Sequence, residues 1–249
     1  MSRYEVINSI DHKDVTVCVD RSSLLGDAVM KAFTFPAEFR MVQSEYPILL
    51  QKNKDESFEP IALFGFEDGQ NLFLSEAGWQ ANYIPAMVAR EPFLIHYAEA
   101  EGVGEISNRL VALDLDHPRV TQQVGEALFD AFGNRTSYLQ SITGTLEKLY
   151  EGIEHSTRFI RALHEYELIE GLTFDITLND GSRNQLLGFY AIDEEKLSRL
   201  PSDALADLSK NGFLMPIFMM LASMSNIQSL IDRRNTLNAG TQIGLEELF

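Results

Sequence analysis

The sequence of 249 residues has little cysteine and little positive charge, and each shortage excludes a class of protein. The single cysteine, Cys18, excludes an intrachain disulfide and a cysteine-rich metal site. The apolar residues around it predict a strand in which Cys18 is a small buried side chain. Lysine and arginine number 20 against 37 aspartate and glutamate residues, a formal net charge of −17. Because such a surface repels phosphate backbones, we expect no nucleic-acid ligand.

The chain also lacks a leader-like N-terminus and, with one exception, a long uncharged run. No apolar stretch follows Arg3, so we expect a cytoplasmic protein without a secretory signal. The exception is residues 213–231, which carry no charge and have about the length of a membrane span. Serine, asparagine and glutamine interrupt its second half, which favours a helix buried in the core. Peripheral attachment to a membrane stays the alternative, since Arg233 and Arg234 would suit the flank of an anchor.

Motifs of common catalytic sites are missing too. There is no glycine-rich phosphate loop ending in Lys-Ser/Thr and no Gly-x-Ser-x-Gly nucleophile turn. The five histidines lie in different predicted elements, so their spacing defines no metal site and we expect no cofactor. An enzyme remains an alternative only if the fold assembles its site, for example from His12, Glu38 and Tyr46.

One short stretch has the residue types of a metal site. Asp114 and Asp116 alternate on a strand predicted over residues 111–116, and His117 follows at its end. Alternation places both carboxylates on one face, so with the imidazole they could converge on a cation. The alternative is a strand that runs out into solvent before Pro118.

Hydropathy patterns predict an α+β fold. Short apolar runs in the first 116 residues read as a mostly antiparallel sheet, and residues 136–168 follow as one long helix. Further on, the sequence Asn179-Asp180-Gly181 predicts a C-terminal β-hairpin. Asp193 then caps the first of two helices, with a split at Pro201. We expect a single domain over residues 1–234, with a possible subdivision near 117–135, and a loose tail over 235–249.

The long helix carries an apolar seam with alternating spacings of three and four residues. Its members are Leu139, Ile142, Leu146, Leu149, Ile153, Ile160 and Leu163, with Ser156 at the remaining step. Such a seam packs lengthwise against another helix or a sheet. It predicts either burial within the chain or a homodimer interface. Gly144 and Gly152 weaken the helix or allow a close approach.

An ordered series of residues resembles a known family. The series comprises Glu38-Phe39, Glu45 to Ile48, Asn71 to Phe73, Trp79, Tyr83 to Pro85, Arg90 to Phe93, and Leu186 to Leu197. Together these residues resemble the SapC family of bacterial proteins, named after surface-layer loci, from about His12 to Leu230. The family pattern commonly has Arg-Arg-Tyr-Pro-Phe where this chain has Ala89-Arg90-Glu91-Pro92-Phe93.

The resemblance implies a protein without an assigned enzymatic activity, in a bacterial surface, uptake or peptide/tryptophan-modification system. It also implies a functional link to a tryptophan-halogenase-like flavoenzyme. We expect a non-catalytic binding or accessory protein with a peptide or protein partner. The candidate contact residues are Glu38, Glu45, Tyr46, Asn71, Trp79, Tyr83, Arg90 and His12, because tryptophan, tyrosine and arginine dominate binding hot spots. The structural alternative is a buried network in which Arg90 bridges Glu38 or Glu45.

Overall fold

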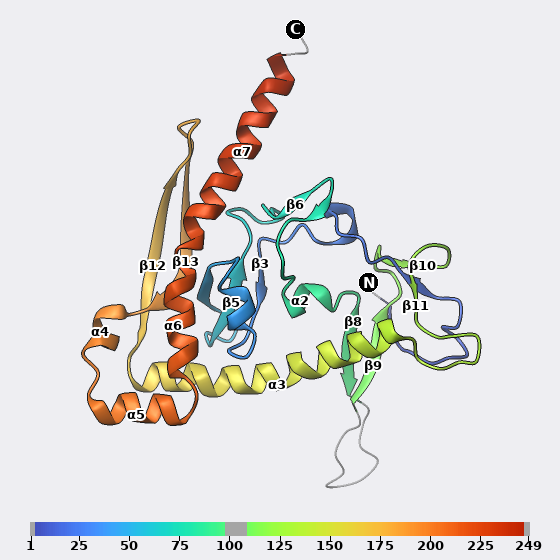
Figure 1. Cartoon of the computed structure of the whole chain (residues 1–249), viewed down its shortest axis with the longest axis horizontal. Coiled ribbons are helices and arrows are strands. Elements are labelled where there is room, and N and C mark those ends of the chain that lie inside the picture. Colours follow the sequence, from blue (N-terminus) through green and yellow to red (C-terminus); the bar gives the residue numbers. More distant parts are fainter. Residues whose placement is uncertain (1–2, 98–108, 247–249) are drawn as a thin grey trace. The chain divides into compact units, whose positions relative to one another are not determined.

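The computed structural model describes residues 3–97 and 109–246, which fall into two interleaved units (Figure 1). The first unit combines Met1–Asp27, Ser75–Trp79 and Ala86–Glu151, and the second combines Ala28–Leu74, Gln80–Pro85 and Gly152–Phe249. The chain crosses between the units after residues 27, 74, 79, 85 and 151. None of these crossings lies in the 117–135 stretch where the sequence suggests a subdivision.

The first unit contains two small antiparallel sheets. One has the strand order β1-β9-β8, formed by Tyr4–Val6, Arg109–Asp114 and Phe93–Tyr97. The other has the order β10-β2-β11, formed by Val120–Thr121, Thr16–Val17 and Glu126–Ala127. Short elements complete the unit: the 3-10 helix Ser23–Leu25, the strand β7 (Gly78–Trp79), which pairs with β6 (Leu74–Ser75), and the helix α2 (Ala86–Ala89).

The core of the first unit joins its sheets to the first half of helix α3, Ser137–Glu165. Val15 and Val17 from the β2 segment pack with Phe93 and Leu113 from β8 and β9. Three residues of the predicted seam, Leu139, Ile142 and Leu146, belong to the same buried cluster. The seam is therefore used inside the chain along this part of the helix, as the first of its two interpretations predicts. Ile153, by contrast, is exposed.

The second unit is built on a five-stranded sheet with the order β12-β13-β4-β5-β3. Its strands are Ile169–Thr177, Arg183–Ile192, Ile48–Lys52, Phe58–Leu63 and Lys31–Phe33. The strands β12 and β13 form the predicted hairpin, and β13 joins the rest of the sheet only through the pairs Phe189–Gln51 and Tyr190–Leu50. Gly181, with φ of 82°, takes the left-handed conformation that its turn requires.

The second unit also contains helices. They are α1 (Phe39–Val42), α4 (Glu194–Ser198), α5 (Ser202–Lys210), α6 (Leu214–Ser223) and α7 (Asn226–Glu246). The side chain of Asp193 accepts a hydrogen bond from the Lys196 amide, which confirms the predicted cap. Pro201 separates α4 from α5, also as predicted. The α+β class is thus confirmed, with antiparallel sheet in the N-terminal half and a long central helix.

The uncharged segment 213–231 forms two helices instead of one. Helix α6 ends at Ser223 and α7 begins at Asn226. Ile217 and Met220 of α6 are buried, and the Ser223 hydroxyl accepts a 2.8 Å hydrogen bond from the Ile48 amide of β4. Among the described residues, Leu214–Ala239 is long and apolar enough for a membrane span by length and composition, a test that core helices of soluble proteins also pass.

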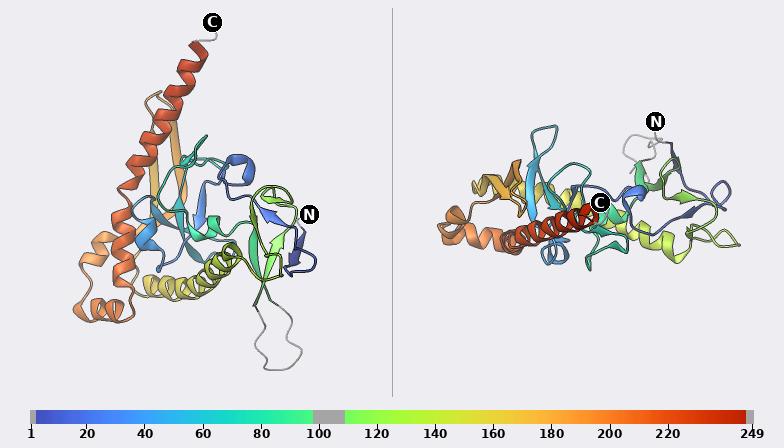
Figure 2. Two further views of the ribbon diagram at one scale, coloured as in Figure 1. Left: turned by 45° about the vertical axis from the view of Figure 1, so that its right-hand side comes forward. Right: turned by 90° about the horizontal axis from the view of Figure 1, so that it is seen from above.

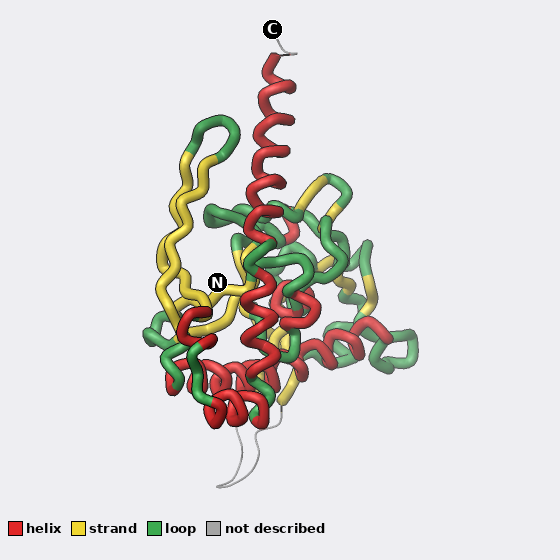
Figure 3. Tube along the Cα trace, turned by 60° about the vertical axis from the view of Figure 1, so that its left-hand side comes forward, coloured by secondary structure: helices red, strands yellow, loops and turns green. Residues whose placement is uncertain are grey.

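Helix α7 replaces the first part of the loose tail predicted from residue 235. It continues to Glu246 and lies beside the β12–β13 hairpin, as two further views show (Figure 2). The tip of the hairpin contacts the helix directly: Asn235 accepts from the Asn179 amide at 2.9 Å, and Asn238 donates to Asp180 at 2.7 Å. Figure 3 shows the two long strands and the helix as neighbours. Asn235 and Asn238 therefore have partners on the hairpin that composition does not reveal.

Two arginines in the first half of α7 contact other parts of the second unit. The guanidinium of Arg233 lies 4.3 Å from the centre of the Phe73 ring and donates to the Gln80 carbonyl at 3.1 Å. The guanidinium of Arg234 lies 3.6 Å from the Glu67 carboxylate. Both residues, which would suit the flank of a membrane anchor, make these contacts within the second unit.

Candidate functional site

Three of the predicted contact residues meet in the second unit, where they form a buried hydrogen-bond network. The Glu38 carboxylate accepts from the Tyr83 hydroxyl at 2.7 Å and from the Thr34 hydroxyl at 2.6 Å. The Tyr46 hydroxyl donates to the Tyr83 carbonyl. Burial, and then the charge of Glu38, raise the pKa of Tyr83 above its usual value. Tyr83 is therefore a protonated donor near neutral pH, and these contacts favour a structural role for the network.

The other predicted contact residues outside the pocket described below have partners of their own. Glu45 accepts from the Asn82 side chain at 2.7 Å, and buried Asn71 accepts from the Phe73 amide at 3.0 Å. Trp79 is half-buried on β7 and belongs to the first unit. Arg90, in the same unit, has local partners: the Glu91 carboxylate at 3.0 Å and the Phe93 carbonyl at 2.6 Å. The expected series thus contains residues of both units.

The stretch from Asp114 to His117 forms a turn, not the continued strand that the sequence predicts. Strand β9 ends at Asp114, whose carboxylate accepts from the Asp116 amide at 3.1 Å. The ring of His117 accepts from the Arg119 amide at 3.2 Å, and its other nitrogen lies 3.9 Å from Glu91. Burial lowers the pKa of His117 below its usual value. Within residues 3–97 and 109–246, no group of three His, Cys, Asp or Glu side chains could hold a metal.

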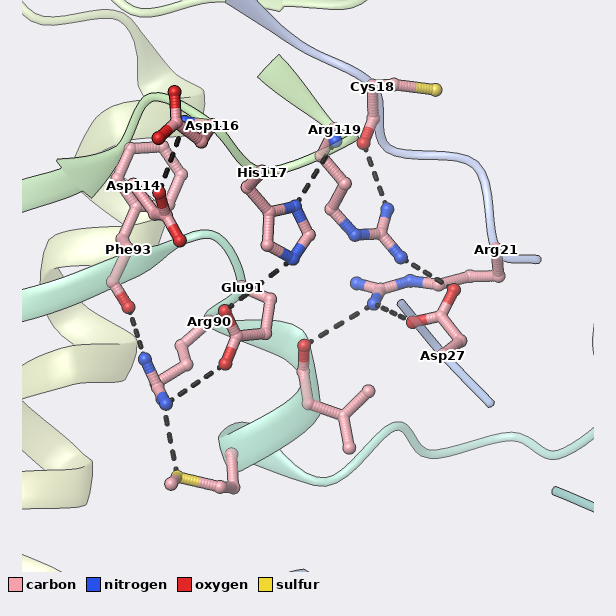
Figure 4. A network of polar contacts seen from close by, with 12 residues as sticks. Cys18, Arg21, Asp27, Arg90, Glu91, Phe93, Asp114, Asp116, His117 and Arg119 are labelled. Carbon is pink, nitrogen blue, oxygen red and sulfur yellow. Dashed lines mark hydrogen bonds and ion pairs between the residues drawn. The ribbon is translucent and has the colours of Figure 1, made fainter. Parts of the chain in front are cut away.

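Close to this turn lies a buried ion-pair network that no local pattern in the sequence marks (Figure 4). Arg119 is 1% exposed, and its guanidinium lies 2.6 Å from the carboxylate of Asp27, which is 2% exposed. Arg119 also donates to the Cys18 and Asp20 carbonyls at 3.0 and 2.6 Å. Arg21 approaches the other oxygen of Asp27 at 3.1 Å. Burial, and then the charge of Arg119, lower the pKa of Arg21.

This network holds together the paired strands β2 and β10, called the β2–β10 ribbon below. Arg119 directly precedes β10, and the carbonyls that it binds follow β2, so one side chain ties the ends of two paired strands together. A buried ion pair with these extra hydrogen bonds satisfies most of the polar atoms that burial removes from water. The network therefore positions the strands that form one wall of the pocket described next.

A half-open pocket of about 360 Å³ lies beside the β2 and β10 segments, within the first unit. Its polar lining includes Arg3, Glu5, Asp11 and His12. Its apolar lining includes Val15, Leu115 and Val120. The volume is at the lower end of the range for small-molecule sites, about 300–1,000 Å³. Of the predicted contact residues, His12 is the one that the structure places in this pocket.

The second unit carries an exposed apolar surface on helices α1 and α6. Met41 is 50% exposed, Met215 57% and Phe218 54%. Met215 and Phe218 are three residues apart on α6 and so share one face of it. The Arg40 guanidinium lies 3.1 Å from the Met215 sulfur, which connects this face with α1.

Comparison with known proteins adds one result to this geometry. The family model described as SapC matches residues 7–230 of the chain. Neither the curated proteins nor the solved structures include a significant match. Because the matched residues span most of the 249-residue chain, the resemblance noted in the sequence is confirmed. This chain belongs to the SapC family.

Proposed function

We propose that this chain is a non-catalytic binding protein that recognises a protein partner through the exposed apolar surface of Met41, Met215 and Phe218. The observation that supports this most is the exposure of Met215 and Phe218 on one face of α6, beside a helix that exposes Met41, in a chain of net charge −17. Contiguous exposed apolar surface on a soluble protein marks interaction sites. Methionine suits such a surface because its flexible, polarisable side chain adapts to the shape of a partner.

The opposite face of α6 anchors this surface. Ile217 and Met220 are buried beneath it, and Ser223 binds the Ile48 amide of the sheet. Beyond Ser223, the Asn226 side chain donates to the Gln43 carbonyl at 2.7 Å, directly after α1. The surface is therefore presented on a fixed base, which lowers the entropic cost of binding a partner.

The partner that fits is an amphipathic polypeptide segment with basic flanks. Its apolar face would cover Met215 and Phe218, and its positive charge would complement a chain of net charge −17. The family setting makes a tryptophan-halogenase-like flavoenzyme from the same bacterium the first partner to test. In this proposal the chain is an accessory protein in the cytoplasm, part of a surface, uptake or peptide-modification system.

The test is a binding measurement between the full-length chain and that flavoenzyme, by isothermal titration at two salt concentrations. We expect the double variant Met215→Glu/Phe218→Glu to weaken binding at least tenfold, since each substitution would bury a charge in the interface. We also expect binding to weaken at high salt. Leu24→Glu is the control, because Leu24 is even more exposed but lies in the other unit.

Equal affinity of the double variant and the wild type would overturn the proposed surface. Absence of a complex at micromolar concentrations would overturn the proposed partner. Circular dichroism of both variants checks that the fold is retained, which the exposure of the substituted side chains leads us to expect.

A further inference from the structure

We infer that the pocket beside the β2–β10 ribbon is a second binding site, for a primary ammonium group attached to a short aliphatic body. The inference does not depend on the proposed function, because the pocket is lined by residues of the first unit and the apolar surface belongs to the second. It rests on the buried histidine, the balance of charge and the apolar wall of the pocket.

His12 is the most buried polar residue of the lining, at 3% exposed. Its Nδ1 accepts from the Asn8 amide at 3.3 Å, which leaves Nε2 as the nitrogen that faces Glu5 at 3.5 Å. A buried imidazole oriented by a backbone donor is a fixed group. His12 therefore positions the Glu5 carboxylate at the pocket.

Glu5 has acceptor capacity left for a ligand. Its two neighbours, Arg3 and His12, both lie 3.5 Å from its oxygens, longer than the 2.7–3.2 Å of a well-formed hydrogen bond. A carboxylate offers about four lone-pair sites. Glu5 is also about half exposed, so an incoming donor can reach it.

The charge of the pocket selects a cation. Two carboxylates, Glu5 and Asp11, face one guanidinium, that of Arg3. Asp11 is held in place by a 2.9 Å hydrogen bond from the Asn8 side chain. An ammonium group donates up to three hydrogen bonds, which suits a pocket lined by two carboxylates. An anionic ligand would meet two like charges for each opposite one.

The apolar wall of the pocket favours a ligand whose remaining part is aliphatic. Val15, Leu115 and Val120 line this side, and Val15 is buried. The wall is held by the β2–β10 pairing, by the 3.0 Å hydrogen bond between Thr16 and Thr121, and by Arg119. A site that is formed before binding favours small ligands because little ordering remains to be done. The free amino end of a peptide and a small aliphatic amine share this chemistry.

The experiment titrates the full-length chain with L-leucinamide and with N-acetyl-L-leucinamide, followed by protein NMR. The first compound carries the ammonium group, and the second has the same body without it. We expect saturable shifts with L-leucinamide only, at residues around the pocket. We expect Glu5→Gln to weaken its binding about tenfold or more, since a charge-assisted hydrogen bond is lost. Asp11→Asn should weaken it as well.

Glu126→Gln is the matched control, because Glu126 is an exposed acid of the same unit that does not line the pocket. It should leave the affinity unchanged. Equal binding of the acetylated compound would overturn the inference, and so would an unchanged affinity of Glu5→Gln. Absence of saturable shifts with L-leucinamide would overturn it too. To separate the two sources of the ammonium group, a peptide with a free N-terminal leucine is then compared with the amine.

Discussion

At the scale of single residues, the buried pair of Arg119 and Asp27 is the most consequential feature of the first unit. Its guanidinium and carboxylate are almost fully withdrawn from water and lie 2.6 Å apart. Removing one partner leaves the other as an uncompensated buried charge, which costs much more than the pair contributes when intact. Arg21 cannot replace Arg119, since it reaches the other oxygen of Asp27 and none of the carbonyls that Arg119 binds.

We therefore predict that Arg119→Met lowers the free energy of unfolding by about 3–5 kcal/mol. Asp27→Asn should also destabilise the chain, and the double variant should cost less than the sum of the two single variants. Urea unfolding of the four proteins in a double-mutant cycle measures this coupling. Lys52→Met is the control, because the ion pair of Lys52 with Glu56 is exposed and should contribute nothing measurable. Strictly additive effects would contradict the prediction.

At the scale of elements, helix α3 contains two glycines whose surroundings differ. A Cβ added to Gly152 would lie 2.4 Å from the ring of Phe35, a residue of the same unit. A Cβ added to Gly144 would meet nothing within 4 Å. Of the two roles that the sequence suggests for glycine in this helix, Gly152 therefore has the close approach. Phe35 is buried and cannot move away without disturbing its neighbours.

We predict opposite effects of the same substitution at these two positions. Gly144→Ala should stabilise the chain by about 0.5–1 kcal/mol, because alanine loses less backbone entropy in a helix. Gly152→Ala should destabilise it by about 1–3 kcal/mol, because the added methyl group overpacks the core. Thermal unfolding of both variants measures the difference. Stabilisation of both variants would contradict the prediction.

At the scale of the whole molecule, the net charge and the partly buried histidines act on stability in opposite directions as the pH falls. Carboxylates become protonated, which reduces the self-repulsion of a chain of charge −17. Burial lowers the pKa of His117 in one unit and of His155 in the other. The unfolded chain then binds more protons at these residues than the folded one. Their contribution to stability is complete above about pH 6.5 and is lost as the pH falls through the folded-state pKa.

We predict that, at about 1 M salt, the urea midpoint of the wild type falls between about pH 7.5 and pH 5.5. At this salt concentration the Debye length is about 3 Å, which suppresses the repulsion among surface carboxylates. The urea midpoint of the variants His117→Gln and His155→Gln should each fall less than that of the wild type. Each substitution removes a histidine that binds a proton less readily in the folded state than in the unfolded state. A fall of the same size in the variants as in the wild type would assign the pH dependence to other groups.

The sequence alone could not predict which of the candidate site residues are engaged by other parts of the fold. Tryptophan, tyrosine and arginine in the motif series suggested a binding surface, yet Tyr83 is tied into the network with Glu38, and Arg90 to its own neighbours. The metal hypothesis assumed that the strand continues to Asp116, whereas it ends at Asp114. Residue type indicates what a side chain can do. Whether it is free to do so depends on partners that the fold supplies.

Features encoded by neighbouring residues were predictable: the hairpin turn at Asn179 to Gly181, the cap at Asp193, the long helix α3 and the α+β class. Backbone preference, capping and hydrophobic periodicity act over a few residues, so a single sequence displays them. The tertiary structure alone brought Asp27 to Arg119 across 92 positions, His12 to its pocket and Asn235 to the hairpin tip. Such contacts form only when distant segments close on one another, and no local pattern records which segments will meet.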